Sequence, residues 1–147
     1  MSYKNVSSTY KETAIKTAGQ GQLIVMLYDE AVKQLTKAIE LLDLDNTKKD
    51  PARIEIINKA IMKTEEILTE LMVSLDFEQG GDISKNLFSL YTWFNRELLE
   101  ANISKDAKRI RIVRDMIMDL RNTWHKISNQ AAETQNREAA VGLNIAG

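Results

Sequence analysis

A scarcity of helix-breaking residues is the feature that most limits what this chain can fold into. Its 147 residues include one proline, Pro51, and six glycines. Proline and glycine are the strongest local interruptions of regular structure, so long helices are favoured. A chain of this length forms one ordinary domain and can bury a sizeable core. It contains no cysteine, so that core is built without disulfides.

Hydrophobic spacing predicts four helices. Apolar residues recur at steps of three and four over about residues 22–43, 51–75, 83–101 and 107–127. Asp50 and Pro51 suit the N-cap and first position of the second helix. The Gly80-Gly81 pair predicts a helix end, with Asp82 capping the next helix. Because short connections make neighbouring helices antiparallel, residues 21–129 are predicted to form an all-α, antiparallel up-down four-helix bundle.

The two ends of the chain lack this pattern. Residues 1–20 predict a flexible N-terminal arm that acts as a lid, with Val6 and Tyr10 aligned four residues apart; a frayed terminus is the alternative. Residues 130–147 are weakly helical in pattern and predict a flexible C-terminal tail. The first twenty residues resemble no signal peptide, and the longest apolar run, residues 23–28, is too short to span a membrane. We therefore expect a cytoplasmic monomer or weak dimer without membrane insertion.

The sequence offers little for catalysis or metal binding. His125 is the one histidine, and no cysteine can serve as nucleophile or ligand. A di-iron bundle would need Glu-x-x-His motifs, but Asn122 stands three residues before His125. No glycine-rich phosphate-binding motif is present. We expect no enzyme activity, no cofactor and no metal, with His125 on the surface.

The fourth helix is basic, which leaves a second functional class open. Its charged residues are Lys105, Lys108, Arg109, Arg111, Arg114, Arg121 and Lys126 against Asp106, Asp115 and Asp119. The alternative function is a generic helical adaptor or a nucleic-acid-binding protein that uses this helix. A solvated face balanced by the acidic end of the second helix is the simpler interpretation. Because no aromatic residues are interleaved for base stacking, we expect no nucleic acid partner.

The first helix is too apolar for a single bundle seam. Fourteen of its residues between 22 and 44 are apolar or tyrosine, whereas a bundle helix buries only a stripe. Surplus exposed apolar surface marks a partner site. The alternative is that the bundle or the N-terminal arm covers the surplus. Methionines such as Met26 and Met72 also suit an adaptable binding surface.

Several motifs resemble those of the flagellar secretion chaperones, the FliS family. Residues 23–29, Leu-Ile-Val-Met-Leu-Tyr-Asp, resemble its Leu-x-x-Met-Leu-Tyr-Asp signature, and residues 75–83 resemble its Leu-Asp-x-Glu-x-Gly-Gly-(Glu or Asp)-Ile loop. Shorter matches lie at residues 86–91, 100–106 and 120–124, and Tyr10 matches an N-terminal tyrosine. The likeness covers about residues 9–127. Gly19-Gln20 replaces the usual Ser-Pro, so we expect a ragged helix start, and Glu30 replaces a glycine.

The resemblance implies a helical bundle that binds the disordered C-terminal segment of flagellin. Such a chaperone keeps flagellin from polymerising in the cytosol and delivers it to the export apparatus, so the export gate is a further expected partner. Recognition would place client helices along apolar surfaces. The residues expected to contact the client are Tyr10, Leu23, Leu27, Tyr28, Asp29, Met72 and Leu75.

Overall fold

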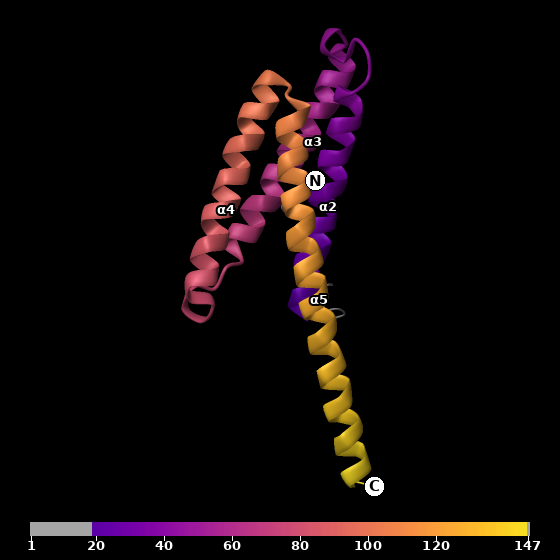
Figure 1. Cartoon of the computed structure of the whole chain (residues 1–147), viewed down its shortest axis with the longest axis vertical. Helices are drawn as coiled ribbons and strands as arrows, with labels where there is room; N and C mark the ends of the chain where they lie inside the picture. Colours follow the sequence, from indigo (N-terminus) through magenta and orange to yellow (C-terminus); the bar gives the residue numbers. More distant parts are fainter. Residues whose placement is uncertain (1–18, 147) are drawn as a thin grey trace, which may run out of the picture. The chain divides into compact units, whose positions relative to one another are not determined.

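Four long helices make up almost all of the part of the chain that the structure describes. In this computed structural model, the described residues are 19–146, with side chains described over 21–130 and at 133, 134, 136 and 137. The elements are α2 (Gly19–Leu42), the 3-10 turn η1 (Thr47–Lys49), α3 (Pro51–Val73), α4 (Phe77–Ser104) and α5 (Ala107–Ala146) (Figure 1). No strand occurs between residues 19 and 146. The predicted all-α class is confirmed.

The described chain forms two compact units. The larger unit, Leu27–Asp119, contains most of α2, all of α3 and α4, and the beginning of α5. Its helices run alternately up and down, joined by short connections (Figure 1), and this arrangement confirms the antiparallel four-helix bundle. The smaller unit contains residues 19–26 of α2 and 120–146 of α5. There Gly21 lies so close to Ser128 that a β-carbon at position 21 would clash with the Ser128 hydroxyl.

Large apolar and aromatic side chains fill the core of the larger unit. They follow the three-and-four spacing of the sequence, because that spacing places them on the inward side of each helix. The Tyr28 hydroxyl on α2 hydrogen-bonds the Tyr91 hydroxyl on α4, and both side chains are buried. The fully buried side chains here include Leu35, Ile57, Ile61, Ile67, Leu68, Leu71, Phe94, Leu98, Ile110 and Ile117.

Of the two predicted helix caps, one is present in the structure and the other is replaced by a different residue. Asp50, which precedes Pro51, accepts hydrogen bonds from the Ala52 and Arg53 amides, and this confirms the predicted start of α3. The prediction that Asp82 caps the third helix is wrong. Asp76 caps α4 instead, because its carboxylate accepts from the amides of residues 78 and 79 at 3.0 Å each. α3 had already ended at Val73, so the Gly80-Gly81 pair lies inside α4.

Gly81 produces a kink within α4. Its backbone has φ of 51° and ψ of −123°, a conformation that favours glycine. A β-carbon there would meet no atom within 4 Å. Replacing Gly81 by Ala should therefore lower the free energy of unfolding by about 1–3 kcal/mol through backbone strain alone. Urea denaturation measures this loss, with Gln79→Ala in the same turn as control. Equal stability of the two variants would contradict it.

Both ends of the helical region extend beyond the predicted limits. α2 begins at Gly19, so the helix includes the Gly19-Gln20 pair that was expected to leave its start ragged. α5 continues to Ala146, whereas the fourth helix was expected to end near residue 127. Good helix formers such as Ala, Gln, Glu and Arg recur in residues 130–140. Mobility of the 130–147 tail stays a prediction. The proposed lid, with Val6 and Tyr10, lies outside the described residues.

Candidate protein-binding face

Two of the predicted client-binding residues are buried. Leu23 exposes 3% of its surface and Tyr28 none. A buried side chain touches a partner only after its neighbours move, so direct client contact by these residues stays a prediction. Tyr10 lies outside the part of the chain that the structure describes.

The other predicted residues are accessible to different extents. Leu27 on α2 is half-buried, as are Met72 near the end of α3 and Leu75 after it, whereas Asp29 is exposed. Among the described residues of α2, Met26 is the only large hydrophobic side chain classed as exposed, at 37%. The surplus apolar surface expected on the first helix is therefore mostly packed inside, as the alternative interpretation held.

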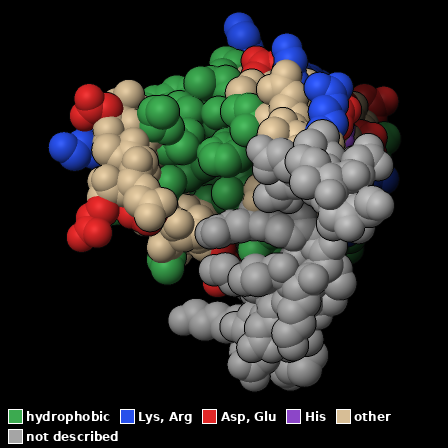
Figure 2. Space-filling view, turned by 90° about the horizontal axis from the view of Figure 1, so that it is seen from below, with side chains coloured by type: hydrophobic (Ala, Val, Ile, Leu, Met, Phe, Trp, Pro, Cys, Tyr) green, Lys and Arg blue, Asp and Glu red, His purple; other side chains and the backbone are tan. Residues whose placement is uncertain are grey.

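Most of the large hydrophobic side chains that the structure shows exposed lie on α3 and α4. They are Ile56, Met62, Val73, Phe77, Ile83, Phe88, Leu99 and Ile103. Figure 2 shows hydrophobic side chains gathered over a broad part of the face that it views. These exposed residues of α3 and α4 were not among those predicted from the sequence to contact a client.

Three of these residues, Met62, Phe88 and Leu99, belong to two stripes along α3 and α4. We name the α3–α4 flank as the surface formed by Asn58, Met62, Glu65, Thr69 and Met72 on α3 with Phe88, Thr92, Asn95, Leu99 and Asn102 on α4. Within each helix the members are three or four residues apart, which places them on one face.

The two stripes border each other along the α3–α4 contact. The Asn95 amide nitrogen lies 4.0 Å from the Met72 sulfur. Farther along, the Lys105 ammonium, at the end of α4, donates to the Asn58 side-chain oxygen at 2.6 Å and to the Asn102 carbonyl at 2.7 Å. These cross-connections place the flank within one packed pair of helices.

Three apolar members of the flank, Met62, Phe88 and Leu99, are open to solvent, and we call them its apolar rims. Met62 on α3 and Leu99 on α4 expose 56% and 55% of their surfaces, and Phe88 is also exposed. The apolar surface continues at the α3–α4 turn, where the Phe77 ring packs edge-on against Phe88 at a centroid distance of 6.0 Å. Exposed apolar surface of this kind suits the apolar face of a partner helix.

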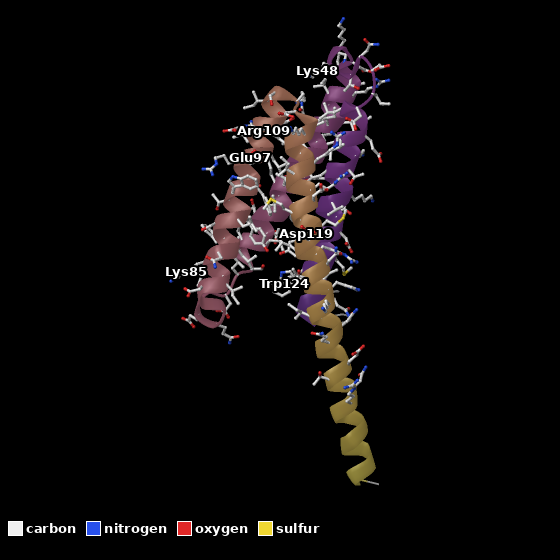
Figure 3. All side chains as sticks on the ribbon, in the orientation of Figure 1. Lys48, Lys85, Glu97, Arg109, Asp119 and Trp124 are labelled. Atoms are coloured by element: carbon white, nitrogen blue, oxygen red, sulfur yellow. The ribbon has the colours of Figure 1, made fainter. Side chains whose placement is uncertain are left out.

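Carboxylates neutralise several of the arginines on the basic fourth helix. Arg109 pairs with Glu97 and with Glu100 of α4, and the first pair can be followed in Figure 3. Arg111 pairs with Asp43, and Arg114 with the neighbouring Asp115. Phosphate binding needs cations that are available to neutralise the phosphates, and an arginine paired with a carboxylate is less available, so these pairs weaken the nucleic-acid alternative.

Nothing among the described side chains resembles a catalytic or metal centre. His125 is exposed, as expected, and its ring nitrogen lies 3.2 Å from the Asn129 amide nitrogen. No group of three or more potential metal ligands occurs where side chains are described. No helix within the described residues is long and apolar enough to cross a membrane.

Comparison with known proteins gives one consistent result. The family described as flagellar protein FliS matches residues 2–131. The flagellar secretion chaperone FliS of Salmonella typhimurium is 35% identical over 126 residues, which cover 86% of this chain and 89% of the relative. That of Bacillus subtilis is 24% identical over 97% of this chain and 99% of the relative. The Escherichia coli protein is 32% identical over 77% of this chain and 79% of the relative.

The family match over residues 2–131 includes the motifs at residues 23–29 and 75–83. The predicted resemblance is confirmed, and with it a chaperone role rather than an enzymatic one. The chain belongs to the FliS family of flagellar secretion chaperones.

Proposed function

We propose that this chaperone binds the disordered C-terminal segment of flagellin in the cytoplasm. It thereby prevents premature polymerisation and delivers flagellin to the flagellar export apparatus, whose gate is a second partner. Membership of the FliS family supports the export role. The exposed apolar rims of the α3–α4 flank are the observation that carries the proposal, since a filament subunit has apolar terminal segments that need cover before assembly.

The physics of the flank suits reversible capture. Burying apolar surface stabilises by about 25 cal/mol per Å², before the cost of ordering the client. Because a disordered segment loses conformational entropy when it becomes helical, the net affinity is lower than the buried area alone would give. The complex can therefore be tight enough to block polymerisation and still release flagellin at the export gate.

The proposed contact surface combines accessible predicted residues with the flank. Met72 on α3 belongs to both sets, and Leu75 lies just after it in the connection between α3 and α4. Leu27 and Asp29 on α2 complete the part of the predicted site that is not fully buried. Tyr10, the remaining predicted contact, belongs to the N-terminal arm that is proposed to act as a lid.

Isothermal titration calorimetry of the full chain with a synthetic flagellin C-terminal peptide tests this function. Burial of apolar surface should give a negative heat-capacity change. Affinity should change little between about 50 and 200 mM salt, whereas a protein making six or more phosphate contacts would lose about a thousandfold over that range. Absence of binding to the peptide would refute the proposal. Tight, steeply salt-dependent binding to a nucleic acid instead would favour the nucleic-acid-binding alternative.

A further inference from the structure

The middle of the α3–α4 flank carries an acidic group, Glu65, that has no ion-pair partner among the described residues. Glu65 lies between Met62 and Thr69 on the α3 stripe and is half-buried. Burial raises the pKa of the Glu65 carboxyl above its usual value. No cation lies within ion-pair distance of this carboxylate among the residues that the structure describes. The free chaperone therefore holds a partly desolvated carboxylate between apolar rims.

A second oxygen on the flank, that of the Asn95 amide, has no hydrogen-bond donor among the described residues. The Asn95 side-chain oxygen is buried and has no hydrogen-bond partner within the described residues. Its amide nitrogen reaches only the Met72 sulfur, which is a weak acceptor. Because this oxygen is shielded from solvent, a client reaches it only after its neighbours move, so the flank group that a client's cation can meet directly is the half-buried Glu65 carboxylate.

A lysine or arginine on a bound helix would match this arrangement. Both side chains carry only donors at their charged ends, and their stems cover apolar surface. Flanking apolar residues at steps of three and four would lie against Met62, Phe88 and Leu99. The apolar rims exclude water on binding, which strengthens a charge pair relative to one at an open surface.

We propose that the α3–α4 flank selects a client helix carrying one lysine or arginine between apolar residues, with that cation pairing with the Glu65 carboxylate. This inference rests on the proposed function, because the client helix is taken to belong to the flagellin C-terminal segment. It adds a charge-based criterion for client choice to a surface that would otherwise accept many apolar helices.

Calorimetry of Glu65→Gln with the flagellin C-terminal peptide tests the inference. The substitution keeps the side-chain shape and removes the charge, so affinity should fall about tenfold, the size of one charge-assisted hydrogen bond. Glu66→Gln is the matched control, because the neighbouring Glu66 is exposed and outside the flank. The control should bind within about twofold of the parent. Glu65→Gln should not melt below the parent at pH 7, because the raised pKa means that burial disfavours the charged form.

A set of peptides, each with one Lys or Arg replaced by Met, identifies the cation. Replacing the pairing cation should lower the peptide's affinity for the parent about tenfold. The same replacement should hardly change the peptide's affinity for Glu65→Gln, because that variant has already lost the pair. If Glu65→Gln binds like Glu66→Gln, or if no peptide replacement shows this coupling, the flank has no charge criterion. If the parent fails to bind every peptide, the proposed function fails first, and the two failures are thus distinguishable.

Discussion

Replacing Leu99 by Asp should weaken binding of the flagellin C-terminal peptide by about a hundredfold or more. Leu99 lies on the rim of the α3–α4 flank with 55% of its surface exposed. A carboxylate there is solvated in the free chaperone, so folding is little affected, but it would lose that solvation against an apolar client helix. Calorimetry gives the affinity, and thermal melting confirms that the variant is folded.

Ser89→Asp is the matched control for this variant. Ser89 is exposed on the same helix but outside the flank, so the substitution adds the same charge away from the proposed contact. It should bind the peptide about as well as the parent. A folded Leu99→Asp protein that also binds like the parent would place the client face elsewhere on the molecule.

Leu98 and Leu99 should separate stability from binding. Leu98 is fully buried in the bundle core, whereas its neighbour Leu99 is exposed. Leu98→Ala should lower the free energy of unfolding by about 2–5 kcal/mol, because it removes buried contacts and leaves a cavity. Leu99→Ala should change it by no more than about 0.5 kcal/mol. Urea denaturation measures both values.

Binding should show the opposite order for this pair. Leu99→Ala removes client contact and should weaken peptide binding, while Leu98→Ala should bind normally under conditions in which it stays folded. Similar stability losses in the two variants would show that Leu99 supports the core. The flank would then lose one of its rims.

The fold could be predicted from the sequence because the apolar spacing and the helix-capping residues indicated the same helices. Apolar spacing of three and four gave the helices, and the Asp50-Pro51 pair marked the start of α3. Sequence was less informative near Gly80-Gly81, where Asp76 and Asp82 are both good capping residues. One possibility was a helix capped by Asp76 that kinks at Gly81, and the other was a helix capped by Asp82. Which of the two forms depends on backbone geometry, so the sequence did not distinguish them.

The binding face was harder to predict for a physical reason. The first helix has the greatest apolar content, but a count of apolar residues does not show how many of them neighbouring helices cover. Most of the large apolar side chains of α2 are buried or half-buried. The flank mixes Met62 and Leu99 with polar residues such as Thr69 and Asn95, so neither stripe stands out as apolar. Its importance depends on two helices lying side by side, which spacing within one helix cannot reveal.

Polymerisation of flagellin in the presence of the chaperone is the most direct test of the central claim. Monomeric flagellin from the same organism would be seeded, and filament growth followed by light scattering with and without an equimolar amount of the full chain. We predict that growth is suppressed by the parent and restored when Leu99→Asp replaces it. Growth at the same rate with the parent chain as without it would contradict the account.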